Sequence, residues 1–372
     1  MALPVVKMSM AKKIIEMTFN EGEKRPVFLL GKGGIGKSEV IATLAKELGV
    51  GYIDIRLLLY TETDIKGIPY PDNNKEFTVW LQNDILPRVE KDGERGILVF
   101  DEITSAMKSV RTAIYQLLNE RKLGNYELPD GWMVVCLGNG EEDGGDYNGL
   151  EGNFANRCSI YRVEPDVESF KEYCVATGVN NLVVSYLNWC SGDLHTYNDN
   201  ESSEDSLLFA SPRSWKAVSE ILNRRAGVID EVTKLRIKSN IGTMVGEKFV
   251  TFCEHINNAI NVEDILQGIT DKKPSSREAI YMTIQNIASK IGAEVKADIT
   301  NNGKASDIVV ERLANAINWL LSIETIEVII MGVKDLIMYS GPEMMGIMLD
   351  PRFDEKCPKL EEFADKHKEI FE

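Results

Sequence analysis

Eight residues near the N-terminus, Gly31-Lys32-Gly33-Gly34-Ile35-Gly36-Lys37-Ser38, have types and a spacing that suit the binding of a phosphate chain. They fit the P-loop pattern G-x-x-x-x-G-K-[ST], in which glycines let backbone N–H groups turn toward the phosphates. Lys37 would reach the β- and γ-phosphates of ATP, or the β-phosphate of ADP, and the Ser38 hydroxyl would ligate Mg²⁺. A glycine-rich turn that matches by chance is the alternative. The predicted nucleotide-binding residues of this segment are Gly31, Gly33, Gly34, Ile35, Gly36, Lys37, Ser38 and Glu39.

Two adjacent carboxylates, Asp101 and Glu102, follow the apolar residues 97–100. This order is typical of a Walker B segment, in which a buried strand delivers two acids to its carboxyl end. We expect Asp101 to bind Mg²⁺ together with Ser38, usually through water molecules, and to belong to the nucleotide site. Glu102 would polarise the attacking water as general base. Without the upstream P-loop, the pattern would indicate only a strand that ends in two solvated acids.

A further apolar run, residues 132–137, ends just before Asn139. At the carboxyl end of a strand, the Asn139 amide is placed to hydrogen-bond a γ-phosphate or the attacking water. Asn139-Gly140 is also a turn dipeptide, so these residues alone leave both interpretations open. Arg213 follows Pro212 at the start of a predicted helix, where an arginine is more often a surface cation than a phosphate ligand.

These side chains need strands that end beside one another. Short apolar runs predict five strands, over residues 27–30, 51–55, 97–100, 132–137 and 158–163. Helical spacing predicts a helix over residues 5–19, a helix that follows the P-loop and ends at Gly49, and a helix capped by Thr104 or Ser105. Strands that alternate with helices indicate an α/β fold with a five-stranded parallel sheet and helices on both faces.

The remaining segments are organised differently. Residues 56–88 have weak periodicity, and connections of this length are usually functional. Gly124-Asn125 between short flanks predicts a β-hairpin within residues 121–129. From residue 227 onward, the spacing of apolar side chains predicts an all-helical region without a catalytic motif, and a short helix within residues 359–372.

The composition limits the class of protein. The chain has 372 residues, of which 44% are hydrophobic and 27% charged, and a formal net charge of −16. This charge argues against a protein whose main task is to coat nucleic acid. Six scattered cysteines without a C-x-x-C pair indicate reduced thiols and a cytoplasmic location. The three histidines lack zinc spacing, lysines interrupt the N-terminal apolar residues, and no apolar run approaches the ~20 residues of a membrane span.

Taken together, these motifs resemble those of the MoxR-type AAA+ ATPases of bacteria and their phages. The resemblance covers roughly residues 1–225, because the P-loop, the Walker B acids, Asn139, Arg157 and Arg213 follow one another in family order. The connecting segments are also similar to the family, over residues 64–72, 78–81, 123–129 and 211–215. The region after about residue 230 lies outside the resemblance.

The resemblance implies roles that the residues alone leave open. Asn139 would be sensor 1, Arg157 the arginine finger for the neighbouring subunit's γ-phosphate, and Arg213 the sensor-2 arginine, acting in cis or in trans. Residues 56–88 would be the helix-2 insert and residues 119–130 the pre-sensor-1 hairpin, both facing a pore or a substrate surface. The implied domains are an AAA+ core, a helical lid and a helical C-terminal region, over residues 1–165, 166–226 and 227–372.

The resemblance also implies an assembly and an activity. A finger in trans requires a head-to-tail ring, and the family suggests six subunits. The expected protein is a ring ATPase, in the cytoplasm of a bacterium or a phage-infected host, that remodels a protein partner, often one with a von Willebrand A domain. The alternatives are a nucleic-acid motor of helicase or restriction type and a nucleotide-gated scaffold with little turnover. The net charge weighs against the motor, and the intact Glu102 and Arg157 weigh against the scaffold.

Overall fold

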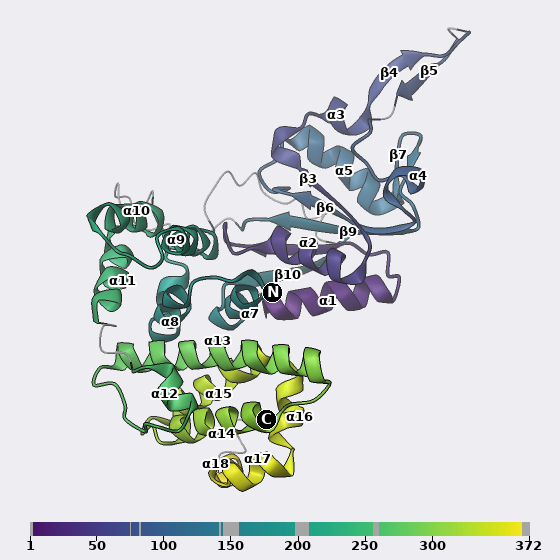
Figure 1. The fold of residues 1–372 in the computed structure, drawn as a ribbon. Coiled ribbons are helices and arrows are strands. Elements are labelled where there is room, and N and C mark those ends of the chain that lie inside the picture. The colour runs from purple at the N-terminus through teal and green to yellow at the C-terminus, as the bar shows by residue number, and fades with distance from the viewer. Residues whose placement is uncertain are drawn as a thin grey trace. The chain divides into compact units, whose positions relative to one another are not determined.

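The computed structural model describes residues 3–74, 76–81, 83–140, 143, 156–197, 208–255 and 260–366. These residues form two compact units (Figure 1). The first unit draws on Met1–Ser169, Tyr197–Ser206 and Ser211–Arg213, and the second on Phe170–Thr196, Leu207–Ala210 and Ser214–Glu372. Every predicted site residue belongs to the first unit.

A parallel sheet forms the centre of the first unit. Within the described residues it has six strands, in the order β1-β10-β2-β9-β6-β3. Their bounds are Val5–Lys7 for β1, Val27–Gly31 for β2, Gly51–Arg56 for β3, Arg95–Asp101 for β6, Gly131–Gly138 for β9 and Ser159–Glu164 for β10. The predicted α/β fold is confirmed, and all five predicted strands are present. The predicted strand number is wrong, because β1 adds a sixth strand at one edge.

Strand β1 occupies the beginning of the segment predicted as a helix over residues 5–19. Val5 pairs with Arg162 of β10, and the Arg162 backbone N–H donates to the Pro4 carbonyl at 2.8 Å. Two adjacent β-branched valines favour an extended backbone, and β10 supplies the pairing edge that the local sequence cannot reveal. The helix α1 therefore begins only at Met8 and spans Met8–Asn20.

The sheet is covered on both faces, because alternate residues of the central strands point in opposite directions. On one face, Ile97 and Val99 of β6 pack with α1 and with α2 (Lys37–Leu48). On the other face, Leu98 and Phe100 pack with α5 (Lys108–Glu120). Burial on both faces explains why the predicted strands are continuous apolar runs.

The start of α5 differs from the prediction, which placed the cap at Thr104 or Ser105. The helix begins at Lys108, and Met107 at its N-cap makes no capping hydrogen bond through its side chain. The Thr104 side chain is buried, and its hydroxyl accepts a hydrogen bond from the Asn139 backbone N–H at 3.1 Å. Thr104 therefore holds the end of β9 and does not cap α5.

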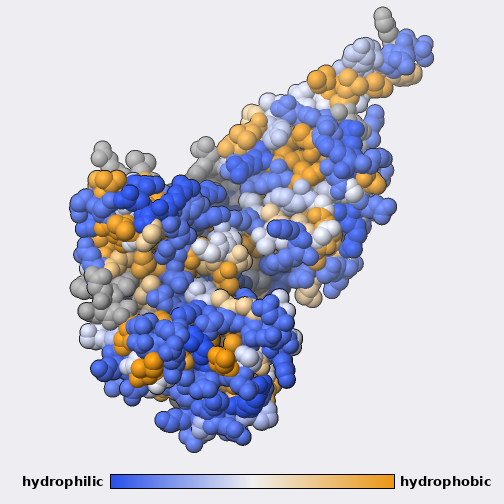
Figure 2. Space-filling view, in the orientation of Figure 1, coloured by the Kyte–Doolittle hydropathy of each residue, from blue (hydrophilic) through white to orange (hydrophobic). Residues whose placement is uncertain are grey.

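The weakly periodic segment 56–88 contains short elements and a hairpin that projects from the sheet (Figure 1). The elements are the 3₁₀ helix η1 (Leu57–Leu59), α3 (Glu62–Lys66), β4 (Ile68–Pro71) and β5 (Thr78–Leu81), and α4 (Val89–Asp92) follows them. Strands β4 and β5 pair antiparallel and expose apolar side chains, among them Ile68, Val79 and Leu81 (Figure 2). The hairpin predicted within residues 121–129 is confirmed as β7 (Lys122–Leu123) and β8 (Tyr126–Glu127).

From Val167 onward every described secondary-structure element is a helix, which confirms the prediction for the region after residue 227. The helices are α7 (Val167–Thr177), α8 (Asn181–Trp189), η3 (Ser191–Leu194), α9 (Pro212–Arg224), α10 (Glu231–Ile241), α11 (Thr243–His255), α12 (Val262–Leu266), α13 (Arg277–Asn302), α14 (Asp307–Leu321), α15 (Ile326–Ser340), α16 (Glu343–Met348), α17 (Pro351–Lys356) and α18 (Lys359–Lys366). The predicted tail helix is α18 as far as Lys366, and residues 367–372 lie outside the described part of the chain. None of the described helices is long and apolar enough to cross a membrane.

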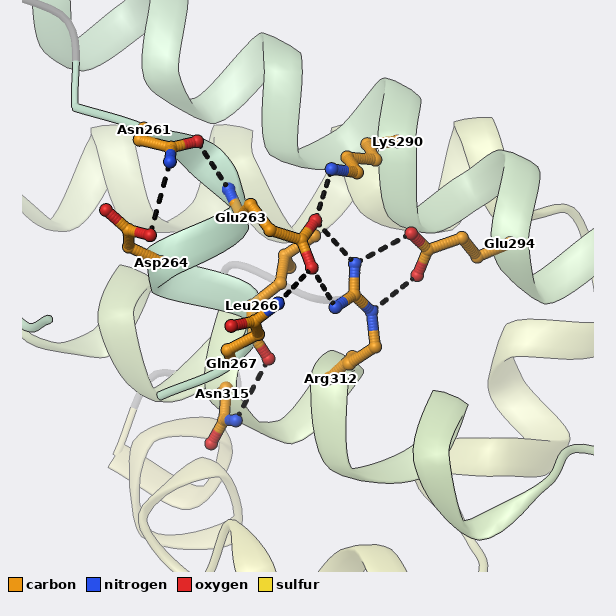
Figure 3. A network of polar contacts seen from close by, with 9 residues as sticks. All are labelled: Asn261, Glu263, Asp264, Leu266, Gln267, Lys290, Glu294, Arg312 and Asn315. Carbon is orange, nitrogen blue, oxygen red and sulfur yellow. Dashed lines mark hydrogen bonds and ion pairs between the residues drawn. The ribbon is translucent and has the colours of Figure 1, made fainter. Parts of the chain in front are cut away.

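The second unit is held together by apolar packing and by ion pairs. Helix α13 packs against α8 and α15, and a buried pair between Lys171 and Asp335 joins α7 to α15. A polar network links α12, α13 and α14 through Glu263, Glu294 and Arg312 (Figure 3). The predicted lid and C-terminal region both contribute to this unit, and their boundary near residue 226 remains a prediction.

Candidate functional site

The glycine loop connects the carboxyl end of β2, where Gly31 is buried, to the first turn of α2. Gly34 and Gly36 have left-handed φ angles of 78° and 92°, which side chains with a Cβ rarely adopt. Gly36 is the N-cap of α2 and brings no capping side chain. The helix dipole and the first N–H groups of α2 therefore suit an anion that comes from outside the helix.

Other loop residues anchor this arrangement. The Ile35 side chain is buried in the core beneath α1 and α2, which fixes the loop from below. Gly33 lies half-exposed between the two ends of the loop, and Glu39 is exposed on the first turn of α2. The predicted residues of the segment therefore lie around one helix N-terminus.

The Lys37 ammonium is buried at the centre of the site. Its Nζ donates to the carbonyl oxygens of Gly31 and Lys32 at 2.6 and 2.9 Å, and to Asn139 Oδ1 at 3.3 Å. Burial lowers the pKa of Lys37 from 10.5 to about 8, and the attraction of Asp101 offsets part of this effect. The described acceptors are neutral oxygens, so a phosphate would bring the negative charge that this buried cation otherwise lacks at hydrogen-bond distance.

Ser38 and Asp101 meet although they are far apart in the sequence. The Ser38 hydroxyl donates to Asp101 Oδ2 at 2.8 Å, and the other carboxylate oxygen, Oδ1, accepts the Glu102 backbone N–H at 2.8 Å. Glu102 itself has a left-handed φ of 57°, although it carries a Cβ. Such a backbone costs about 1–3 kcal/mol and often occurs at functional sites.

The donor set of this site fits Mg²⁺. A hydroxyl and a carboxylate are hard oxygen ligands, and Mg²⁺ commonly uses one or two such groups together with nucleotide phosphates and water. Among the described residues, no three His, Cys, Asp or Glu side chains converge as they would in an all-protein metal site. The Ser38–Asp101 pair therefore suits a metal that arrives with the nucleotide.

Asn139 follows β9 and completes the arrangement around Lys37. Its side-chain oxygen accepts from Lys37 Nζ, and its backbone N–H is held by Thr104. Gly140 does not have a left-handed φ, so Asn139-Gly140 does not form the left-handed turn that this dipeptide favours. The Asn139 side chain lies beside the loop that would bind phosphate.

Arg213 also reaches this region. Its backbone N–H donates to the Gly34 carbonyl at 3.2 Å, and a Cβ on Gly34 would lie only 3.1 Å from the Ser211 hydroxyl. The Arg213 charge is close enough to contribute to the lowered pKa of Lys37. The second residue of α9 is thus fixed against the glycine loop.

Arg157, in contrast, does not join these residues. It precedes β10, whose first residue Ser159 pairs with Val27 at the amino end of β2. The register places Val163, and not Ser159, beside Gly31. The four steps along the strand from Ser159 to Val163 span about 13 Å, so Arg157 lies at the opposite end of the strands from its own P-loop.

Sequence reasoning missed several residues around the site. Asp143 is buried, and its carboxylate accepts from the Gly140 N–H and from Arg162 of β10. Four acids lie within residues 141–146, so nothing in the sequence distinguishes Asp143 from its neighbours. On β3, the Tyr52 hydroxyl donates to the Ser38 carbonyl at 3.3 Å, and burial followed by the Asp101 charge raises the pKa of Asp54.

Comparison with known proteins agrees with this geometry in the first unit. Residues 26–142 match the family model described as the AAA domain, dynein-related subfamily. Midasin from Giardia intestinalis is 26% identical over 158 residues, which are 40% of this chain and 3% of midasin. The chain thus corresponds to a small part of that relative. Residues 26–142, which match the AAA domain, contain the P-loop, Asp101-Glu102 and Asn139.

Two solved structures are similar at low sequence identity. Hsp104 in its closed state with ATPγS and FITC casein is 16% identical, covers 63% of this chain and 46% of its own, and gives a TM-score of 0.37. The Thermotoga maritima RuvB Holliday junction branch migration motor is 14% identical, covers 88% of this chain and 86% of its own, and gives a TM-score of 0.31.

The strand order and the AAA-domain match agree on the architecture of the first unit. The first unit has the fold of AAA+ P-loop ATPases, with a parallel sheet whose β2 delivers the glycine loop to α2. The match supports nucleotide binding and ATPase activity at the level of this family.

Proposed function

We propose that this protein is an ATP-hydrolysing AAA+ ring ATPase that remodels or assembles a protein partner. One observation supports this function most directly: the buried Lys37 ammonium lies between the glycine loop and Asn139 and is bonded to neutral oxygens. A buried cation at a helix N-terminus is suited to a polyphosphate, and the oxygen pair beside it is suited to the accompanying metal.

Each residue of the candidate site then has a defined role. Backbone N–H groups of the loop and the Lys37 ammonium bind and orient the phosphate chain. Ser38 and Asp101 would hold Mg²⁺, which would supply charge neutralisation at the phosphates. Glu102 accepts a proton from the attacking water, and the Asn139 amide orients that water or the γ-phosphate.

Arg157 and Arg213 would stabilise the charge that develops during phosphoryl transfer. Arg213 is fixed against the P-loop of its own chain, which favours action in cis. Arg157 lies at the far end of the strands, so it would serve the site of a neighbouring subunit. Such a finger contributes on the order of 10³–10⁵ in rate, and its use in trans implies a head-to-tail ring of, we propose, six subunits.

The partner is proposed to be a protein. The projecting β4–β5 hairpin exposes apolar side chains that could contact a polypeptide, and the formal charge of −16 opposes general binding to nucleic acid (Figure 2). The MoxR-type assignment adds the further proposal that the partner carries a von Willebrand A domain.

The test measures ATP hydrolysis as a function of protein concentration. The rate per subunit should rise steeply as the ring assembles, and Lys37→Ala and Glu102→Gln should abolish turnover. Arg157→Ala should also abolish turnover while each subunit still binds ATP. Mixing Arg157→Ala with Glu102→Gln subunits should restore part of the activity, because some interfaces then combine an intact Glu102 with an intact Arg157.

Three results would contradict parts of this proposal. An unchanged rate in Arg157→Ala would refute the finger in trans. Stimulation of turnover by single- or double-stranded DNA would favour a nucleic-acid motor. ATP binding without measurable hydrolysis by the assembled wild type would favour a nucleotide-gated scaffold.

A further inference from the structure

A buried ion pair lies directly behind Asn139. The Asp143 side chain is fully buried, its Oδ2 accepts the Gly140 backbone N–H at 2.7 Å, and its Oδ1 accepts Arg162 Nη2 at 2.9 Å. A carboxylate without contact to water is costly unless it is paired and hydrogen-bonded. In Asp143, Oδ1 is paired with a cation and Oδ2 accepts a backbone hydrogen bond, so the carboxylate is fixed on two sides.

The pair packs against the backbone that follows Asn139. A Cβ on Gly140 would lie 2.6 Å from Asp143 Oδ2 and 3.2 Å from Arg162 Nη1. Since the φ of Gly140 is not left-handed, the absence of a side chain serves this close approach and not an unusual backbone angle. The peptide on the carboxyl side of Asn139 is therefore held by the ion pair.

The peptide on the amino side of Asn139 is held as well. Its N–H donates to Thr104 Oγ1, and a Cβ on Gly138 would lie 2.7 Å from Thr104 Cγ2. With both flanking peptides fixed, the Asn139 side chain has a defined origin and direction, and its oxygen reaches Lys37 Nζ. Placement of the amide within a fraction of an ångström is what a γ-phosphate contact needs.

Arg162 carries this restraint across the sheet. It belongs to β10, where it pairs with Leu30 of β2, and β2 separates β10 from β9. The contact between Arg162 and Asp143 therefore spans the strand that delivers the P-loop. The planar guanidinium places Nη2 on the carboxylate and Nη1 next to Gly140, which the single nitrogen of a lysine does not do.

We propose that Asp143 and Arg162 are positioning residues that hold the Asn139 amide against the γ-phosphate of bound ATP. This proposal rests on the proposed ATPase function and adds a second layer to its site. The described hydrogen bonds of Asp143 go to Gly140 and Arg162, and none goes to the glycine loop. We therefore expect the pair to affect turnover through Asn139 and to leave the binding of ADP nearly unchanged.

The experiment is a double-mutant cycle measured on the full chain. Asp143→Asn, Arg162→Lys and Gly140→Ala are each made in the wild type and in Asn139→Ala. For each protein, kcat and KM for ATP, the Kd of a fluorescent ADP analogue and the melting temperature are measured. Asp130→Asn makes the same chemical change at an exposed ion pair with Lys24 and serves as the matched control.

In the wild-type background, we expect kcat to fall about 10-fold in Asp143→Asn and Gly140→Ala and less in Arg162→Lys. KM and the ADP affinity should stay within about 2-fold, and Asp130→Asn should behave as the wild type. In the Asn139→Ala background, the same substitutions should cause no further loss of kcat, because the group they position is gone. If Asp143→Asn does not fold, Arg162→Lys and Gly140→Ala carry the same test.

Losses that multiply in the Asn139→Ala background, or an ADP affinity that falls in parallel with kcat, would show a general structural role and overturn the proposal. Failure of the proposed function would look different. A wild type without turnover would refute the proposed ATPase activity. An Asn139→Ala variant with wild-type turnover would refute the proposed role of Asn139. The positioning proposal would fail in either case.

Discussion

Two buried or half-buried cations, Lys37 in the first unit and Arg312 in the second, are satisfied in opposite ways. Lys37 Nζ has two backbone carbonyls and one amide oxygen as its described acceptors. Arg312 makes paired hydrogen bonds to Glu294 at 2.7 and 2.8 Å and to Glu263 at 2.7 and 3.1 Å (Figure 3). Arg312 is neutralised by its own chain, whereas Lys37 is left to a ligand that brings negative charge.

Several helix N-termini of the second unit differ from the N-terminus of the P-loop helix in the same way. In the second unit, side chains accept hydrogen bonds from first-turn N–H groups of several helices: Asp230 for α10, Asn261 for α12, Ser276 for α13, Ser306 for α14 and Asp350 for α17. The P-loop helix α2 starts at Gly36, which has no side chain to do this. The five capped helices satisfy first-turn N–H groups within the chain, whereas α2 brings no side chain to its own.

The largest expected effect tests this difference at Lys37. Lys37→Met should weaken ATP and ADP binding about 100-fold, because the charged hydrogen bonds to phosphate are lost. The same change should leave the stability of the nucleotide-free protein unchanged or raise it, since a costly buried ammonium is replaced by an apolar side chain of similar length. Titration calorimetry measures the nucleotide affinity, and urea unfolding measures the stability of the nucleotide-free protein.

A loss of stability in Lys37→Met comparable with the loss of binding would contradict the view that this cation is held for a ligand.

The converse is expected at Arg312. Arg312→Gln should lower the free energy of unfolding by roughly 2 kcal/mol, because Glu294 then loses its described counter-charge and Glu263 keeps only that of Lys290. Nucleotide affinity should not change, since Arg312 lies in the second unit. Urea unfolding followed by circular dichroism, with ADP titration as the functional control, measures both. Reduced ADP affinity at full stability would contradict this division of tasks.

A pH dependence follows from Glu263. Its hydrogen bonds to Arg312 and Lys290 hold the pKa of its carboxyl well below the ordinary 4.5. A depressed pKa contributes stability that is complete above about pH 4.5 and is lost as the pH falls toward the folded-state value. The melting temperature of the wild type should therefore exceed that of Glu263→Gln above pH 5, and the gap should narrow steadily below it. A gap that widens on acidification would be inconsistent with this sign.

The smallest expected effect concerns backbone strain. Glu102→Gly should raise the free energy of unfolding by roughly 1 kcal/mol, because glycine adopts the left-handed φ without penalty, while turnover is lost. Ala226 has a left-handed φ of 49° within the second unit and provides the matched control. Ala226→Gly should give a similar gain with turnover intact. Urea unfolding and ATPase assays distinguish the two positions.

Local signals made much of the fold predictable. The strand before the P-loop and the helix after it lie within 22 residues, so their apolar spacing and the glycines suffice to define strand, loop and helix. The α/β fold followed from apolar runs that alternate with helical stripes. Strand β1 could not be predicted in this way, because three residues become a strand only when the edge of β10 is there to pair with them.

The neighbourhood of the candidate site was harder to predict. Thr104 was expected as a helix cap, and only the approach of β9 turns its hydroxyl toward Asn139. Asp143 was one acid among several in a polar segment, and its burial depends on Arg162 from a strand two positions away in the sheet. Such contacts join residues without any shared local pattern.

The sequence by itself determined the chemistry that this protein can perform. The P-loop, the Asp101-Glu102 pair and Asn139 are defined by residue type and by short-range spacing, which act before any long-range contact forms. The tertiary structure alone decided how these groups are held. The order of the parallel strands brings Ser38 to Asp101, sets Asp143 and Arg162 behind Asn139, and leaves Arg157 at the far end of β10. The physical reason is that strand pairing and the burial of charge depend on neighbours that are distant along the chain.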